Sequence, residues 1–411
     1  MPKYNERSDI SENRLLLSYG EEVTKNLLKD HTTQQNIYWA TDSYAELGEG
    51  FGFFDLITLD KITSYVSDEG IVVSKEQYDD IVTQYPDDKD KYQELIRPRA
   101  IKSKAEQTQR AKDKAEVFTP SWICNAQNNL IDEAWFGRTT GLFNSPDPED
   151  PHKWINNEEP ISFEGTGKTW KDYVSDMRLE ITCGEAPYLA NRYDAVTGDY
   201  NEVAKYRIGM LDRKLRIVSE NAKDSKDWIL WAKIALRSTY GFEWQGDNLL
   251  LAREALFFTF SEHYIERFGE KTFNQNKLRM MPGVAYIVSW NIWQMDGLTY
   301  GLPGHEEDMK NRKQRDEQYQ AKLKEYKRQK NKREALAKAV DDLFCFNGMS
   351  MLKLVEPVPA PVQPFEQYCL IKDFFAGVDL TKATLKSQDF HDKSAPKQTF
   401  ESLVNKNKPQ Q

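Results

Sequence analysis

The middle of the chain alternates between short runs of strand-like residues and longer segments in which apolar residues recur at helical spacing. The strand-like runs are RLEIT at residues 178–182, YGFEW at 240–244 and GVAYIVSWN at 283–291. The helical segments fall at residues 211–221, 227–240 and 249–269. Strands that alternate with helices of this length predict a mostly parallel sheet with helices on both faces. We therefore expect an α/β fold with helical additions at both ends.

The same pattern divides the chain into five parts. A long polar helix follows the core, and a proline-rich linker leads from it to a small appendage. The last stretch is polar, rich in lysine and poor in apolar residues, which is typical of disorder. The expected parts are a mixed or helical N-terminal region at residues 1–110, the α/β core at 111–302, the long basic helix at 303–345, the C-terminal appendage at 346–386 and the disordered tail at 387–411.

The charge of the chain is acidic overall but unevenly distributed. The 411 residues carry a net charge of −9, whereas the stretch from Lys310 to Arg333 holds eleven Lys or Arg against three Asp or Glu. A local basic element is enough to bind a phosphate backbone, because counterion release depends on the charges in contact. The stretch therefore fits either a DNA-binding helix or an ordinary solvated one.

Composition argues against several other classes of protein. The four cysteines are scattered without a C-x-x-C pair and the five histidines form no i, i+4 pair, so we expect neither a metal site nor a disulfide framework. The N-terminus lacks an apolar signal segment and no run of about 18 apolar residues occurs, which predicts a cytoplasmic protein without membrane contact. Residues 165–169 (GTGKT) end like a phosphate-binding loop, but Ser162 stands where that loop needs its first glycine.

A tight turn containing Gly184 follows the first strand-like run. Such a turn lets backbone N–H groups and the next helix N-terminus approach a ligand, although a single glycine is not a specific signal. Glu243 ends the second run, where an acidic residue accepts hydrogen bonds from ribose hydroxyls in nucleotide-binding α/β folds. The separation of Gly184 from Glu243 exceeds that of a minimal βαβ unit, which predicts an insertion near residues 197–214.

Three segments of the chain resemble a known family. Residues 116–120 (EVFTP), 179–189 (LEITCGEAPYL) and 238–256 (STYGFEWQGDNLLLAREAL) are similar in order and type to motifs X, I and II of the gamma-class and type I restriction-modification adenine-N6 DNA methyltransferases. The chain also resembles bacterial proteins labelled restriction endonuclease subunit M, through strings such as AEVFTPSWICN and SWNxWQMDG. The motif-level resemblance covers residues 115–260, and the broader one runs from residue 37 to residue 300.

This resemblance implies a Rossmann-like methyltransferase core that binds S-adenosylmethionine. The tryptophan beside the acidic residue would lie against the adenine, although ordinary core packing explains it equally well. The implied contacts are Phe118, Thr119 and Pro120 at the methionine and carboxylate end, Glu180, Cys183 and Gly184 around the amino-acid moiety, Glu185 at the ammonium group, Glu243 at the ribose and Trp244 at the adenine.

The catalytic motif of the family is absent from the chain. Adenine-N6 enzymes use [DN]-P-P-[YFW], whose amide or carboxylate and proline carbonyl accept hydrogen bonds from the target amino group while the aromatic ring stacks on the flipped base. No such sequence occurs here, and residues 289–296 (SWNIWQMD) stand where it is expected. Asn291 would then replace the amide, with Trp293 or Trp290 as the stacking ring. The loss of both prolines removes the rigid turn of the motif.

The resemblance implies a DNA adenine-N6 methyltransferase, or an M-like subunit of one, in a bacterial restriction-modification or phage-defence system. Double-stranded DNA would be its substrate, and a specificity or nuclease subunit a possible partner. The missing motif motivates an alternative: a catalytically degenerate methyltransferase fold that acts as a DNA-binding or assembly subunit. A third hypothesis gives a nuclease function to an end of the chain, but Pro86–Lys89, the one acidic start for such a site, lacks a following strand.

Overall fold

A computed structural model of the protein describes residues 18–32, 104–113, 116–298, 300–302, 312–343 and 369–400, with shorter pieces at 64–67, 72–74, 80–85 (except 82), 92–94 and 98–102 and the single residues 15 and 37. The chain forms two compact units, one from residues 1–300 and 369–411 and the other from residues 301–368. Each is described by itself. Among the residues described, no helix is both long and apolar enough to cross a membrane.

A three-stranded parallel sheet lies at the centre of the first unit. Its strands are β6 (Arg178–Ile181), β7 (Thr239–Glu243) and β8 (Ile292–Gln294), which are neighbours in that order. The register pairs Ile181 with Phe242 and Phe242 with Trp293. The predicted α/β class with a parallel sheet is therefore confirmed, and so are the first two predicted strands.

Two helices make each connection between the strands. The helices α9 (Met210–Asn221) and α10 (Ser225–Arg237) join β6 to β7, and α11 (Gly246–Phe268) and α12 (Glu270–Asn291) join β7 to β8. The helical segments predicted at 211–221, 227–240 and 249–269 correspond to α9, α10 and α11. The start of α10 is set by Asp224, whose side chain accepts hydrogen bonds from the backbone N–H groups of Lys226 and Asp227.

The predicted third strand at residues 283–291 is wrong, because those residues are the last turns of α12. Met281, Val284, Ala285 and Val288 are buried at i, i+3, i+4 and i+7 spacing, and the helix packs against α11 and α2. This packing overrides the strand propensity of the β-branched and aromatic residues, and Pro282 is accommodated within the helix. The strand itself is confined to the three residues of β8.

The described helices cover one face of the sheet, which corrects the expectation of helices on both. Two parallel crossovers that step in the same direction place their helices on the same face, since such crossovers are right-handed as a rule. On that face Gly241 approaches Leu189, Cys183 and Ile292, which belong to the same buried cluster as the helices. The opposite face carries Tyr240, Phe242 and Trp293, and these rings pack against one another and against Phe400 from the C-terminal segment.

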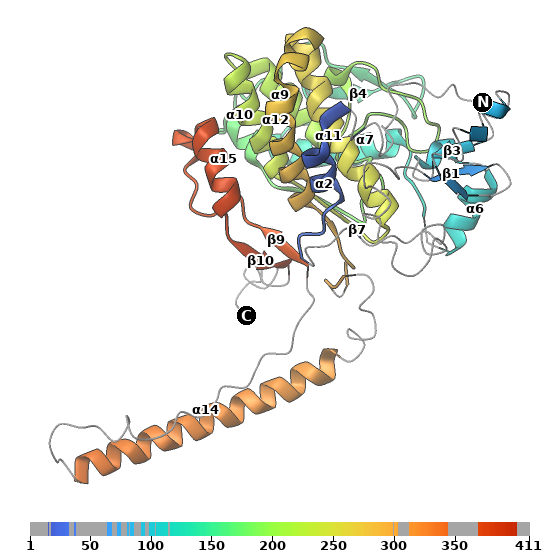
Figure 1. Ribbon diagram of the computed structural model, residues 1–411. Helices are drawn as coiled ribbons and strands as arrows, with labels where there is room; N and C mark the ends of the chain where they lie inside the picture. Colours follow the sequence, from blue (N-terminus) through green and yellow to red (C-terminus); the bar gives the residue numbers. More distant parts are fainter. Residues whose placement is uncertain are drawn as a thin grey trace. The chain divides into compact units, whose positions relative to one another are not determined.

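The N-terminal helix α2 (Glu21–Leu28) is locked onto this core (Figure 1). The Arg253 guanidinium of α11 donates to the carbonyls of Leu27 and Lys29 and to that of Ile292. Directly after α2, the His31 ring stacks on the Trp290 ring of α12, with 4.0 Å between the ring centroids. Burial, with Arg253 next in effect, lowers the pKa of His31 to about 2, so this imidazole is neutral.

The remaining elements of the first unit are short and lie around the core. One earlier expectation changes here. Residues 387–400 are not a disordered tail, since they include most of a helix and a strand. The elements are β1 (Ser64–Ser67), β2 (Val72–Ser74), β3 (Tyr92–Glu94), η2 (Arg99–Ile101), α6 (Lys104–Asp113), α7 (Ser121–Phe136), β4 (Asn144–Pro146), β5 (Trp154–Asn156), α8 (Trp170–Ser175), η3 (Ala204–Tyr206), β9 (Leu370–Lys372), η5 (Leu380–Lys382), α15 (Leu385–Ser394) and β10 (Lys397–Thr399).

In the second unit the structure describes one long helix, α14 (Arg312–Leu343). It lies within the predicted basic helix at residues 303–345. Between residues 321 and 335 the side chains are exposed, apart from Leu323 and Tyr326, which are partly buried. Over residues 321–335 the helix therefore presents its lysines and arginines to solvent.

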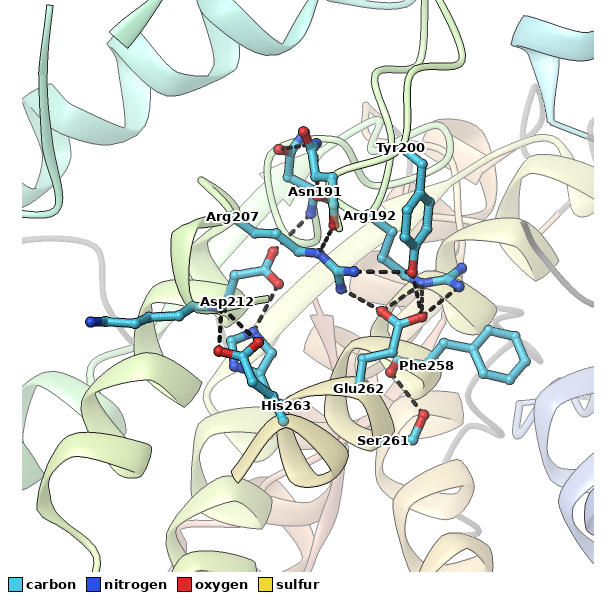
Figure 2. Close-up of polar contacts among 12 residues, drawn as sticks. Asn191, Arg192, Tyr200, Arg207, Asp212, Phe258, Ser261, Glu262 and His263 are labelled. Atoms are coloured by element: carbon cyan, nitrogen blue, oxygen red, sulfur yellow. Dashed lines mark hydrogen bonds and ion pairs between the residues drawn. The ribbon is translucent and has the colours of Figure 1, made fainter. Parts of the chain in front are cut away.

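A buried ion-pair cluster anchors the loop between β6 and α9, which contains the predicted insertion (Figure 2). The Glu262 carboxylate on α11 accepts hydrogen bonds from Arg192, Arg207 and the hydroxyl of Tyr200. Arg192 also lies over the Phe258 ring at 5.0 Å. Burial raises the pKa of Glu262, but the two guanidinium groups outweigh it and lower that pKa to about 2. The loop is thus held by one carboxylate shared between two buried cations.

We predict that Glu262→Gln destabilises the fold by about 3–5 kcal/mol at neutral pH, because two buried guanidinium groups lose their counter-charge. Chemical denaturation measures the change. The folded pKa of Glu262 is depressed, so its contribution is present above the unfolded value of 4.5 and is lost as the pH falls toward about 2. The two proteins should therefore converge in acid. Glu164→Gln, at an exposed position outside this loop, is the control, with an expected change within about 0.5 kcal/mol. A Glu262→Gln protein as stable as this control would contradict the anchoring role.

Candidate functional site

The turn after β6 has an unusual backbone that directs it toward β7. Thr182, Gly184 and Ala186 all have positive φ, at 52°, 55° and 62°. Non-glycine residues pay for this conformation, which persists only where the surroundings enforce it. The backbone N–H of Gly184 donates to the Glu243 carboxylate at 2.9 Å. The turn and the end of β7, predicted to lie together, do lie together.

Phe118 forms one wall of the turn. A Cβ atom placed on Gly184 would lie 2.5 Å from Cε1 of the Phe118 ring, so only glycine allows this approach. The Arg99 guanidinium lies over the same ring at 5.6 Å. The first and second motif-like segments of the sequence are therefore in contact.

Two buried carboxylates, Glu180 and Glu243, lie at this edge of the sheet. Burial raises the pKa of Glu180 well above 4.5, although the N–H groups of Tyr188 and Leu189 bond to it, and the charge of Glu243 raises it further. Oε2 of Glu180 is buried and has no hydrogen-bond partner among the described residues. Burial also raises the pKa of Glu243, against the N–H groups of Gln245 and Gly184. The donors of the site therefore do not offset the cost of ionising these two carboxyl groups.

A second group of polar residues lies at the start of α11 and was not identified from the sequence. Arg110 of α6 bonds to Glu116 and, at 2.6 Å, to Asp247 in the first turn of α11. Oδ1 of Asp247 and the side-chain oxygens of Gln245 and Asn248 are buried without hydrogen-bond partners in the described part of the chain. The sequence could have indicated these residues by their position, because polar residues directly after a parallel strand lie where ligands bind in α/β sheets.

The other predicted cofactor residues occupy varied positions. Trp244 is partly exposed beside Glu243, whereas Thr119 and Pro120 are partly exposed at the start of α7. Cys183 is buried, and burial raises the pKa of its thiol, so it fills space as a small residue. Glu185 is turned away from a ligand role: its carboxylate accepts from the backbone N–H of Arg99 at 2.6 Å and from the Tyr193 hydroxyl at 2.8 Å.

The structure does not bring Asn291 and Trp293 to this edge. Asn291 is fully buried, and its amide donates to the carbonyls of Leu236, Arg237 and Thr239. Thr239 is the first residue of β7, so Asn291 lies at the amino-terminal end of the strands. The glycine turn lies at their carboxyl end, about 13 Å further along the strand. The Trp293 ring is 5% exposed and stacks on Tyr240. These positions do not favour contact with a flipped base, and the catalytic roles stay predictions.

Trp290 does not provide an alternative stacking ring, since it is buried against His31.

Within the residues that the structure describes, no group of three or more His, Cys, Asp or Glu is placed to hold a metal ion. Residues 86–89, considered for a nuclease site, lie outside the described residues.

Comparison with known proteins gives no assignment: no family model, no curated protein and no solved structure matches the chain.

We predict that Gly184→Ala costs more than its positive φ alone explains. Gly141 has a similar φ of 67° and open space around a Cβ, so Gly141→Ala measures the backbone cost, about 1–2 kcal/mol. The clash with Phe118 should add at least about 1 kcal/mol for Gly184→Ala. Adding Phe118→Leu should recover part of that excess in denaturation experiments. Equal costs for the two glycine variants would show that the ring does not wall the turn.

Proposed function

We propose that the chain binds S-adenosylmethionine at the carboxyl edge of β6 and β7, as the cofactor-binding part of a DNA adenine-N6 methyltransferase with a Rossmann-like core. Bacterial restriction-modification and phage defence are the systems in which the resembling proteins occur. The parallel order of the strands, the turn at Gly184 and the acidic end of β7 support this proposal.

The observation that carries the proposal is the buried Glu180 carboxyl group, whose charged form the chain stabilises only weakly. Glu180 has a raised pKa and a buried oxygen without a hydrogen-bond partner among the described residues. Such a group, once ionised, gains most from a cation, which supplies both the opposite charge and the missing donors. S-adenosylmethionine carries an ammonium and a sulfonium group, whereas a dinucleotide would bring phosphates next to the same carboxyl groups. The site thus fits the first ligand better than the second.

The neighbouring residues fit the rest of the cofactor. Each oxygen of Glu243 accepts one backbone N–H, from Gly184 at 2.9 Å and from Gln245 at 3.0 Å. A carboxylate oxygen has a second lone pair, so both can still accept from ribose hydroxyls. Trp244 is partly exposed at the same edge and offers a ring face to an adenine. Asp247 and Asn248 add buried acceptors nearby.

The catalytic half of the reaction is less well supported by this chain. The bound cofactor would supply the methyl group, and the chain must then orient a target amine and accept a proton from it. Asn291, the predicted residue for this task, is buried at the opposite edge. We therefore favour a subunit that binds the cofactor over a self-sufficient enzyme. Transfer of labelled methyl groups to adenine in duplex DNA by the purified chain alone would reverse that preference.

We predict that S-adenosylmethionine raises the melting temperature of the wild-type chain, because a ligand that binds only the folded state stabilises it. Glu180→Gln should reduce the affinity at least tenfold, about 1.4 kcal/mol, in calorimetric titration. The unliganded variant should be no less stable than the wild type, since the amide avoids burying a charge.

The pH dependence separates charge from shape in this test. The folded pKa of Glu180 is raised, so the folded state holds the extra proton and unliganded stability falls as the pH rises above 4.5. A cationic ligand needs the ionised form, so its affinity should rise over the same range for the wild type and stay flat for Glu180→Gln. Glu159→Gln, at an exposed position, is the control. Binding that is unchanged by Glu180→Gln would refute this assignment.

We also propose that α14 contributes contacts to the DNA backbone. Its stretch from Lys310 to Arg333 is strongly basic in an acidic chain, and its described lysines are exposed. A helix that is polar on all sides gains little from packing, so binding to a polyanion offers a reason for its charge.

We predict that replacing Lys322, Lys324, Lys327 and Lys330 of α14 by glutamine weakens binding to duplex DNA and flattens its salt dependence. Each lost phosphate contact lowers the slope of log K against log salt by about 0.9. Fluorescence anisotropy over a salt series measures both quantities. The control removes the same charge from the other unit, at the exposed residues 153, 171, 223 and 226. Equal effects of the two sets would show non-specific attraction rather than a role for α14.

A further inference from the structure

In the described part of the chain, β6 is an edge strand of the sheet with no neighbour on its outer side. Among the described residues β6 pairs with β7 alone. At the far side, all three residues of β8 are buried. The residues Met177, Leu179 and Ile181 are 63%, 39% and 64% exposed, whereas Arg178 and Glu180 between them are buried. An alternating apolar strand face left in solvent is rare in a monomeric domain.

Part of the β6 backbone has no strand partner among the described residues. The Arg178 N–H donates to the Ser238 carbonyl, and the parallel register continues through Glu180 and Gly241. In such a ladder the intervening residues, Leu179 and Ile181, turn their backbone groups away from β7, where the Ile181 carbonyl accepts from the Thr182 hydroxyl at 2.6 Å. The open edge therefore combines main-chain groups without a described strand partner with apolar side chains, which are the two components of recognition by strand addition.

The exposed apolar surface continues beyond the strand. Asp132 of α7 lies 3.5 Å from Arg178, and the chain neighbours of this pair, Ile131 and Met177, are both exposed. Exposed apolar side chains thus occur both on β6 and on the neighbouring helix α7.

The position of this edge indicates what covers it. The carboxyl end of β6 leads directly into the turn at Gly184, which contacts Glu243. A strand added parallel to β6 would end beside the same turn, because the carboxyl ends of parallel strands share one edge. The loop after that strand would face the proposed cofactor site. No D-P-P or N-P-P sequence occurs in these 411 residues, so they do not supply such a loop.

We infer that the open edge of β6 docks a parallel β-strand from a separate polypeptide, whose following loop carries the [DN]-P-P-[YFW] sequence and completes the methyltransferase site. This inference rests on the proposed function. It assigns cofactor binding to this chain and the orientation of the target adenine to its partner. We expect the partner strand to carry apolar side chains on the same side of the sheet as Leu179 and Ile181.

Site-directed crosslinking of the full-length chain in its native cell tests the inference. The photoreactive residue p-benzoylphenylalanine replaces Ile181, and a matched control carries it at Leu278, which is 68% exposed on α12. We expect a crosslink at position 181, at least tenfold stronger than at 278, to a polypeptide with the [DN]-P-P-[YFW] sequence. Adding that polypeptide to the purified chain should produce methyl transfer to adenine in duplex DNA.

Ile181→Lys provides the second arm, because a charge on an exposed edge strand opposes pairing without disturbing the core. It should reduce the reconstituted methyl transfer at least tenfold and leave the melting shift with S-adenosylmethionine unchanged. A crosslink to a second copy of this chain, a captured polypeptide without the motif, or equal yields at 181 and 278 would each overturn the inference. Absence of a melting shift in the wild type would instead refute the proposed function.

Discussion

The consecutive parallel order of β6, β7 and β8 is the constraint on which the rest of the structure depends. Because both crossovers step the same way, their four helices gather on one face and form the core there. The same order directs the carboxyl ends of the strands to one edge, where the turn at Gly184 contacts Glu243. On the other face of the sheet, the C-terminal segment covers the part near β8. No described residue covers the part near β6. The proposed ligand site and the exposed edge of β6 thus both follow from the order of the strands.

Two buried carboxylates show how the fold treats charge differently in its scaffold and in its proposed site. Glu262 lies between Arg192 and Arg207, and its pKa falls to about 2. Glu180 has only backbone donors, and its pKa is raised. The first arrangement compensates the burial of a charge within the chain. The second leaves that compensation to something outside it, which is what distinguishes a binding site from a structural ion pair.

Local pattern was sufficient to predict β6, β7 and the helices α9, α10 and α11, because their periodicity and their packing agree. It failed for α12, where the residues GVAYIVSWN favour a strand but Val284 and Val288 pack as a helix on α11 and α2. The contact of Phe118, Gly184 and Glu243 followed from the order of the motifs. The group around Arg110 did not, since it joins Glu116 to Asp247 across more than a hundred residues and no local spacing reports such a pair.

The error in α12 changes the assignment of the catalytic residues. A strand at residues 283–291 would have ended at Asn291 and delivered its amide to the ligand edge. With the helix in its place, Asn291 comes before β8 and bonds to the carbonyl of Thr239, at the amino edge. Moreover, β8 pairs with β7, so the carboxyl end of β8 lies on the Glu243 side of the turn and not beyond β6. A group that approaches the cofactor from the β6 side must come from outside this ladder. The proposed cofactor binding can therefore be separated from catalysis in this fold.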